Sequence, residues 1–374
     1  MRQRRRSGFT ALALALGLLA AACGSSSGGS SGSSGTSGGT KESAATCKGA
    51  TGEASSVKAV GGVTATGAGK KVGVVLDIGG KNDKSFNQAA FTGLTAAEKD
   101  FGIAGKILEP NKDGSNRGEL LRSLAQDGYP YVIGVGFNFA ADMAKVDKDF
   151  PNIKFGIIDD ASFTAPNVTS LVFAEEQGSY LVGAAAALAS KTGKIGFVGG
   201  VNTDLIKKFE AGYTAGAKAV NPDIAVSVKY ISQPPDFSGF TDPASMKPIA
   251  EGMYADGEDV VYHAAGGSGT GLFPVSAAKD RLAIGVDSDQ YQQVPADQQK
   301  CVLTSMIKRV DLAVYDSIGE FLNGTLKGGE QRFDLKSGGI DFATDGGQLD
   351  SFKDKLDDYK QQIIDGKITV PTAP

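Results

Sequence analysis

The stretch VGVVLDIGGKNDKSFNQ, residues 72–88, decides the fold that the sequence predicts. Its apolar run, Val72–Leu76, is too short for a helix and ends at the carboxylate of Asp77, which is typical of a buried parallel strand. Two glycines and several polar residues then form a turn. Ser85 and Gln88 have the Ser-x-x-Gln spacing of a capping box, so we expect a helix to begin there. A strand, a glycine turn and a helix in this order indicate an open α/β sheet.

The residues after this turn predict a helix with one buried face and a ligand site at its start. The following apolar and small residues recur at helical spacing: Phe86, Ala89, Ala90, Gly93, Leu94, Ala97 and Phe101. Ligands of open α/β sheets bind beyond the carboxyl ends of the strands. Asp77, Asn82, Asp83 and Phe86 are therefore predicted to hold a polar ligand with a flat ring. The alternative is a solvated turn that carries one core phenylalanine.

The N-terminus has the pattern of an export signal. Four arginines precede the apolar run Phe9–Ala22, which is too short to span a membrane. Cys23 follows small residues, as in a bacterial lipoprotein signal, so we expect residues 1–22 to be removed and Cys23 to carry a lipid. Ala20 departs from the usual pattern of such signals, and an ordinary export signal or a short anchor is the alternative.

The length and the charge of the mature chain limit its possible functions. The 374 residues suffice for two domains and a sizeable core. Residues 24–40 are only Gly, Ser and Thr, and we expect residues 23–69 to form the lipidated cysteine and a flexible tether. Loss of the four arginines in residues 1–22 moves the formal charge from −4 to −8. An acidic exported chain is a poor candidate for nucleic-acid binding, but it suits a neutral or cationic small molecule.

Two cysteines remain when Cys23 carries lipid. An exported pair such as Cys47 and Cys301 can form a disulfide. That bond would join the start of the mature domain to a late strand. Two unpaired thiols are the alternative, because spacing alone does not decide connectivity.

From Lys70 onward, strands and helices alternate in two successive series. The predicted strands are Val72–Leu76, Ile103–Leu108, Tyr131–Val135, Phe155–Ile158, Thr169–Phe173, Ile195–Gly200, Ala225–Ile231, Val260–Ala264, Leu282–Val286 and Cys301–Met306. After the first helix, the predicted helices are Arg117–Gln126, Phe139–Asp147, Glu175–Ser190, Asp204–Val220, Ala244–Ala255, Gly271–Arg281, Asp311–Leu326 and Gln348–Asp365. The series predict an α/β protein of two doubly wound domains with parallel sheets. We expect residues 70–173 with 306–332 to form one lobe and residues 174–305 with 333–374 the other, with a cleft between them.

Motifs that would indicate an enzyme are weak. The glycine-rich turn 266–271 follows a strand, but it does not match a nucleotide phosphate loop, and a close backbone approach to a ligand fits it better. His263 is the only histidine and ends an apolar strand, so a satisfied, partly buried histidine is the better interpretation. Asp159 and Asp160 could act as an acid–base pair, although their place after a strand suits ligand binding equally. We predict no catalytic residue, metal or cofactor.

Several segments resemble the BMP (basic membrane protein) family, the PnrA-like substrate-binding lipoproteins of ABC importers. The opening segment, Asp77–Gln88, contains Asp-Lys-Ser-Phe-Asn-Gln. Similar segments follow in order at residues 134–137, 155–159, 175–179, 199–200, 208–212, 262–267, 285–290 and 304–309. The resemblance implies a type I periplasmic-binding-protein fold that closes around a nucleoside, typically a purine one.

The resemblance also implies roles for particular residues. Asp77 would bond the ligand, Phe86 would stack on the base, and Asp159, with Asp160 as the alternative, would bond the base edge. Asp287 would accept the ribose hydroxyls near Lys308, and the Gly266-Gly267 turn would approach the sugar. Phe240 is the expected second ring, with Phe209 as its rival. Further contacts are expected from Asn82, Asp83, Asn87, Gly136 and Phe137.

The sequence thus predicts a lipid-anchored, extracytoplasmic receptor that delivers a nucleoside to an ABC permease. An acidic cleft should prefer nucleosides to phosphorylated nucleotides. One alternative keeps the fold and binds a sugar, an autoinducer or an amino acid. Another is a nucleoside-cleaving enzyme with Asp77, Asp83 or Asp159 as base, and a third is a signalling receptor that uses the same cleft.

Overall fold

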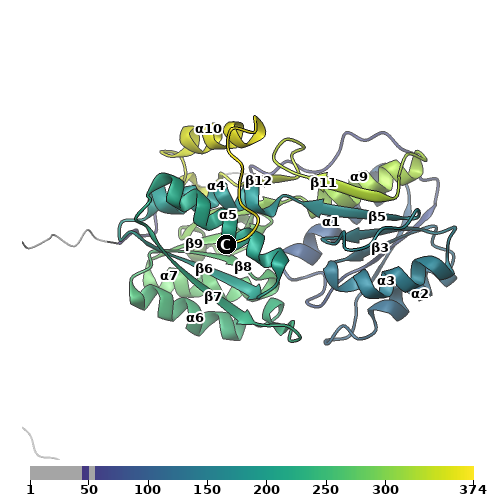
Figure 1. Ribbon diagram of the computed structural model, residues 1–374, viewed down its shortest axis with the longest axis horizontal. Coiled ribbons are helices and arrows are strands. Elements are labelled where there is room, and N and C mark those ends of the chain that lie inside the picture. The colour runs from purple at the N-terminus through teal and green to yellow at the C-terminus, as the bar shows by residue number, and fades with distance from the viewer. Residues whose placement is uncertain (1–43, 50–54) are drawn as a thin grey trace, which may run out of the picture. The chain divides into compact units, whose positions relative to one another are not determined.

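The computed structural model describes residues 44–49 and 55–374, and within them the strands form two six-stranded sheets (Figure 1). The first sheet is parallel throughout, in the order β11 (Gly329–Phe333), β5 (Val168–Phe173), β4 (Lys154–Ile158), β3 (Tyr131–Val135), β1 (Lys71–Val75) and β2 (Ala104–Leu108). The second has the order β12 (Ile340–Phe342), β10 (Val302–Lys308), β9 (Leu282–Asp287), β8 (Val260–Ala264), β6 (Lys194–Val201) and β7 (Ala225–Ser232). Only β12 runs antiparallel to its neighbour in the described sheets.

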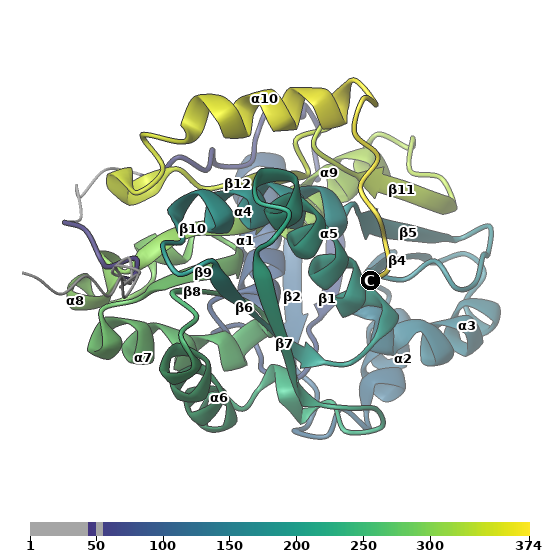
Figure 2. The same ribbon diagram turned by 60° about the vertical axis from the view of Figure 1, so that its left-hand side comes forward.

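Helices cover both faces of each sheet because the central strands are apolar on both faces. The helices that pack on the first sheet are α1 (Phe86–Phe101), α2 (Arg117–Gln126), α3 (Ala140–Asp149) and α9 (Val310–Leu322). Those that pack on the second are α4 (Glu175–Ala189), α5 (Asp204–Val220), α6 (Pro243–Asp256) and α7 (Leu272–Lys279), while α8 (Ala296–Gln299) contacts α7 and α10 (Lys353–Ile364) contacts α4 (Figure 2). We call the first sheet with its helices lobe 1, and the second sheet with its helices lobe 2.

The chain passes between the lobes more than once. After β5 it enters α4 of lobe 2, and after β10 it returns to lobe 1, where α9 packs on α1 and β11 pairs with β5. It then re-enters lobe 2 at β12. The sequence predicted this return but neither short strand, because β11 alternates exposed and half-buried residues at a sheet edge and β12 has three residues. The lobe boundaries given above stay a prediction.

Residues that precede the first strand lie against both lobes. Ala45 donates its backbone N–H to the buried carboxylate of Asp259 over 2.9 Å, and Ser56 does the same to Asp345 over 2.8 Å. Further along, the carbonyl of Thr64 accepts from Asn323 over 3.1 Å. Residues within 44–49 and 55–69 therefore make defined contacts, although the sequence predicted a flexible tether as far as residue 69. Residues 1–22 and Cys23 lie outside the described residues.

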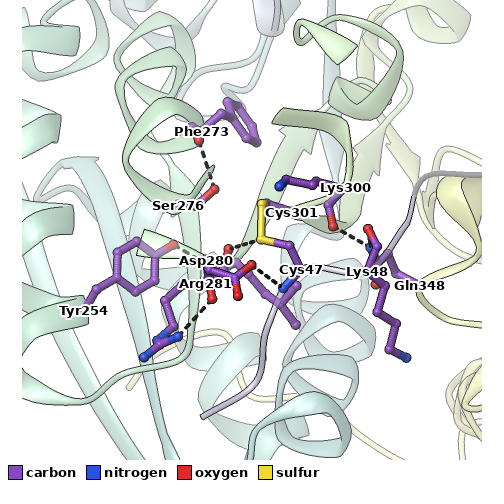
Figure 3. Close-up of a disulfide and its surroundings, with 11 residues drawn as sticks. Cys47, Lys48, Tyr254, Phe273, Ser276, Asp280, Arg281, Lys300, Cys301 and Gln348 are labelled. Atoms are coloured by element: carbon purple, nitrogen blue, oxygen red, sulfur yellow. Dashed lines mark hydrogen bonds between the residues drawn. A yellow bond between two sulfur atoms is a disulfide. The ribbon is translucent and has the colours of Figure 1, made fainter. Parts of the chain in front are cut away.

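Cys47 and Cys301 form a disulfide, with their Cα atoms 4.5 Å apart (Figure 3). The bond joins the N-terminal segment to the residue that precedes β10. Around it, Cys47 donates its N–H to Asp280, and the carbonyl of Lys300 accepts from Gln348 over 2.6 Å (Figure 3).

No helix within 44–49 and 55–374 is both long and apolar enough to span a membrane.

The disulfide is expected to stabilise the fold, because it closes a loop with a sequence separation of 254. The double substitution Cys47→Ser/Cys301→Ser should lower the free energy of unfolding by about 2–5 kcal/mol. Urea denaturation followed by circular dichroism measures this, and the double variant should no longer respond to a reducing agent. An unchanged midpoint, in the variant and in the reduced protein, would contradict the prediction.

Candidate functional site

A cavity lies between the lobes at the carboxyl ends of both sheets and holds about 640 Å³ of empty space, including its open part. From lobe 1 it is lined by Asp77, Ile78, Asp83, Phe86, Asn87, Gly136, Phe137 and Asp159. From lobe 2 it is lined by Leu205, Ile206, Phe209, Phe240, Ala264, Gly266, Gly267, Val286, Asp287 and Lys308.

Asp77, two residues after the end of β1, is already bound by protein groups. Arg117 donates to Asp77 Oδ1 from Nε over 2.8 Å and from Nη2, and Asn138 donates to Oδ2 over 3.3 Å. Gly136 has φ +118°, and a Cβ there would lie 3.0 Å from Asp77 Oδ2, so glycine is required. Asp77 therefore reaches the cavity as part of a neutral pair, not as a free carboxylate.

The capping box predicted from Ser85 and Gln88 is wrong. Ser85 precedes α1, but its side chain makes no capping bond. Asp83 caps the helix instead, since its carboxylate accepts from the backbone N–H groups of Ser85, Asn87 and Gln88 over 2.8–3.0 Å. An ionised carboxylate with two oxygens satisfies more of the unpaired N–H groups at a helix start than one hydroxyl can. Burial nevertheless raises the pKa of Asp83.

Asn87 ties the helix start to the strand end. Its Oδ1 accepts from the backbone N–H of Asp77 over 2.8 Å, and its Nδ2 donates to Asp83 over 3.0 Å. Asp83 and Asn87 line the cavity, yet their polar side-chain atoms are hydrogen-bonded to other groups of the protein. Asn82 is exposed and does not line the cavity.

Lys308 occupies the centre of the site, and only 2% of its side chain is exposed. Its Nζ lies 2.6 Å from Asp159 Oδ2 and 3.2 Å from Glu175 Oε1. The rings of Phe86, Phe173 and Phe209 surround the ammonium group, with centroids at 5.2, 4.9 and 5.6 Å. Cations bind to the faces of aromatic rings, so these rings add to the stabilisation of the charge.

The charges at this centre change one another's pKa. Burial alone would lower the pKa of Lys308, but Asp159, Glu175 and Asp287 outweigh it, and the pKa rises above its usual value. Burial raises the pKa of Asp159 to about 6, against the effect of Lys308. Asp159 Oδ1 is buried and has no hydrogen-bond partner among the described residues. The cavity therefore contains a hydrogen-bond acceptor available to a ligand.

Asp287, the last residue of β9, lies on the lobe 2 side of the cavity. Ser85 Oγ donates to its Oδ2 from lobe 1. Burial raises the pKa of Asp287 to about 7, although Lys308 lowers it. Asp159 and Asp287 both have left-handed backbones, with φ of 69° and 66°. Such conformations are uncommon for residues other than glycine and cluster at functional sites.

Both candidates for the second ring line the cavity. Phe240 lies on Gly200, where a Cβ would come within 2.6 Å of its ring, which explains this glycine near the end of β6. Phe209, on α5, is more buried and faces Lys308. Phe240 as the second stacking ring, with Phe209 as its rival, stays a prediction.

His263 and Asp160 make their side-chain hydrogen bonds within the protein. His263 is buried, its Nε2 lies 2.8 Å from Gln290 Oε1, and burial lowers its pKa to about 4, so it is neutral. Asp160 accepts from the N–H and hydroxyl of Ser162 and does not line the cavity. Residues 44–49 and 55–374 contain no group of three or more His, Cys, Asp or Glu side chains arranged to hold a metal.

Comparison with known proteins places this arrangement in a family. The family described as "ABC transporter substrate-binding protein PnrA-like" matches residues 70–373. The chain is 38% identical over 319 residues to the ABC transporter nucleoside-binding protein BmpA of Lactococcus lactis, covering 81% of this chain and 89% of that protein. It is 32% identical over 311 residues to basic membrane protein A of Borreliella burgdorferi, covering 81% and 88%.

The chain belongs to the PnrA-like family. A crystal structure of an ABC transporter solute-binding protein from Aeropyrum pernix has a TM-score of 0.71 and 27% identity, and covers 81% of this chain and 93% of that one. The resemblance and the two-lobed fold predicted from the sequence are thereby confirmed.

Several features of this PnrA-like site were missed from the sequence, among them the lining residues Ile78, Ala264 and Val286. Arg117 pairs with Asp77, Glu175 contacts Lys308, and Leu205 and Ile206 add apolar walls. Arg117 carried one usable signal, because a cation is unfavourable in the first turn of a helix unless something else binds it. Glu175 and the two apolar residues looked like ordinary helix positions.

The raised pKa of Asp287 predicts that this residue lowers the free energy of unfolding of the ligand-free protein, and that it does so more at alkaline pH. An acid whose pKa rises on folding, here from 3.8 to about 7, destabilises the fold as the pH rises through that value. Asp287→Asn cannot ionise, so at pH 8 it should unfold less easily than wild type, by up to about 4 kcal/mol at ~1.4 kcal/mol per pKa unit.

Urea denaturation at pH 5 and pH 8 measures this difference, which should shrink at pH 5. Asp223→Asn, on the exposed surface, is the matched control and should change stability little at either pH. A variant less stable than wild type at both values would contradict the prediction.

Proposed function

We propose that this PnrA-like protein binds a nucleoside, preferably a purine nucleoside, in the cavity between its lobes. It works on the extracytoplasmic side, anchored through lipid on Cys23, and delivers the ligand to a membrane permease. The Lactococcus lactis relative, named as a nucleoside-binding protein, supports the ligand class. The residues proposed to hold the ligand are Asp77, Phe86, Gly136, Phe137, Asp159, Phe240 or Phe209, Gly266, Gly267, Asp287 and Lys308.

The observation that carries this proposal is the combination of aromatic walls with buried carboxylate oxygens. Phe86 from lobe 1 and Phe240 or Phe209 from lobe 2 offer flat apolar faces, which suit the two faces of a purine. Asp159 Oδ1 would accept a hydrogen bond from a ring N–H or an exocyclic amine. Asp287 would accept from the ribose hydroxyls with charge-assisted strength.

The charge of the cavity favours a ligand without phosphate. Lys308 is already matched by Asp159 and Glu175, and Arg117 by Asp77, so neither cation is left to pair with a phosphate. Asp287 adds a further carboxylate near Lys308. A phosphate group would be placed among acidic oxygens in a poorly hydrated site, where like charges repel strongly.

Isothermal titration calorimetry tests the proposal. Inosine, guanosine or adenosine should bind with one site per chain, and AMP should bind more weakly than adenosine because its phosphate is repelled. Galactose, ribose and a set of amino acids serve as comparison ligands. Binding of a sugar or amino acid in place of nucleosides, or tighter binding of AMP, would contradict the proposal, and steady release of free base from inosine would indicate an enzyme.

A matched pair of variants on α1 tests whether the nucleoside occupies this cavity. Phe86→Ala removes a cavity ring and should weaken nucleoside binding by about 1–3 kcal/mol, as for other bases stacked on aromatic side chains. Phe91→Ala removes a ring from the same helix that does not line the cavity, and it should leave the affinity unchanged. Equal effects of the two substitutions would remove Phe86 from the site.

A further inference from the structure

Several hydrogen bonds cross between the lobes beside Asp287 and meet at Lys84 and Ser85. The hydroxyl of Ser85 donates to Asp287 Oδ2. The carbonyl of Lys84 accepts from Gln290 Nε2 over 3.0 Å and from Ser288 Oγ over 3.3 Å. Lys84 and Ser85 belong to the turn after β1 in lobe 1, and these three partners follow or end β9 in lobe 2. We call these five residues the latch. Lys84 Nζ also donates to the carbonyl of Gln293 over 3.3 Å.

The lobe 1 half of the latch faces lobe 2 because of the local backbone. Asp83 caps α1, so the hydroxyl of Ser85 is not needed at the helix start and bonds across the cleft. Lys84 has φ 57°, in the left-handed region, and its carbonyl receives both bonds from lobe 2. Ser85 is fully buried, so no water competes for its hydroxyl in this closed arrangement.

The lobe 2 half is held rigidly by Gln290. Its Oε1 accepts from the backbone N–H of Val286 over 3.0 Å and contacts His263 Nε2, while its Nε2 reaches Lys84. The buried histidine therefore orients the amide that bonds lobe 1. Asp287 follows Val286 directly, so its position at the end of β9 is fixed by the same contacts.

Asp287 belongs to the latch and to the cavity at once. One oxygen, Oδ2, accepts from Ser85, and Asp287 also lines the cavity. We propose that Ser85 is a positioning residue that couples lobe closure to ligand binding, by holding the carboxylate of Asp287 from the opposite lobe so that its second oxygen meets the ligand. This inference rests on the proposed function in placing the ligand in this cavity.

The electrostatics of Asp287 give the coupling a measurable signature. Burial raises its pKa most, and Asp83 and Asp159 raise it further, while Lys308 and the hydrogen bond from Ser85 lower it. Loss of the Ser85 hydroxyl should therefore raise this pKa and leave more of the carboxyl protonated at neutral pH. Because a protonated carboxyl is a weaker acceptor, the loss of affinity should be largest near neutral pH and smaller in alkaline solution.

The test compares Ser85→Ala with Ser288→Ala, which removes a latch bond that does not touch Asp287. Inosine affinity is measured by calorimetry from pH 6 to pH 9. Ser85→Ala should weaken binding about 10- to 100-fold near pH 7, as expected for a hydrogen bond to a charged group, with a smaller loss at pH 9. Ser288→Ala should weaken binding less and keep the wild-type pH profile.

A double-mutant cycle with Asp287→Asn separates positioning through Asp287 from a general structural effect. If Ser85 acts through Asp287, then Ser85→Ala should add little to the loss caused by Asp287→Asn. Ser85→Gly should behave as Ser85→Ala does and serves if the alanine variant does not fold, since glycine is tolerated before a helix. An equal loss in both backgrounds, or a loss independent of pH, would overturn the proposal.

Ligand-free protein provides a second readout that does not depend on the ligand being a nucleoside. In small-angle X-ray scattering, Ser85→Ala should have a larger radius of gyration than wild type, because the closed arrangement loses its buried cross-lobe bond. If no nucleoside binds wild type, the proposed function fails and the latch is judged on scattering alone. A radius of gyration unchanged by Ser85→Ala would then overturn it.

Discussion

The ammonium group of Lys308 is the charge on which the rest of the site depends. Its side chain is almost completely buried, and a buried cation is tolerated only where carboxylates and other polar groups compensate it. Asp159 comes from the end of β4 in lobe 1, and Glu175 from the start of α4 in lobe 2. The two lobes must therefore approach each other at this point for Asp159 to pair with Lys308. Three phenylalanine rings around the same group exclude water and strengthen these interactions.

This constraint explains why the cavity suits an uncharged ligand with acidic partners. Lys308 is matched within the protein, and Arg117 is matched by Asp77, whereas Asp159 Oδ1 has no hydrogen-bond partner among the described residues. Asp159 directly follows β4 of the first sheet, and Asp287 is the last residue of β9 in the second sheet. Both residues have left-handed backbone conformations. In the latch, Ser85 of lobe 1 donates a hydrogen bond to Asp287 of lobe 2. In our proposal, this bond connects ligand recognition to lobe closure.

The sequence predicted most of the fold, because strands and helices of a doubly wound protein have distinct apolar periods. Val72–Leu76 and the strands after it were found from buried apolar runs, whereas the edge strand β11 was missed because its residues alternate in exposure. Residues at strand ends, such as Asp159 and Asp287, were found for a physical reason: parallel strands direct their carboxyl ends to one edge of the sheet. The pairs Arg117–Asp77 and Lys308–Glu175 were not found, since each joins residues far apart in the chain. The sequence also failed to predict that Asp83, and not Ser85, caps α1. The hydroxyl of Ser85 bonds Asp287, and only the folded protein brings these two residues together.

The central claim is that the two lobes close around a nucleoside. Native mass spectrometry of protein purified without unfolding, from cells grown in rich medium, tests this claim most directly. The account predicts a bound species whose mass, after release and fragmentation, is that of a purine nucleoside, at no more than one per chain. A co-purified sugar or amino acid, or binding of neither adenosine nor inosine when they are added to ligand-free protein, would contradict it.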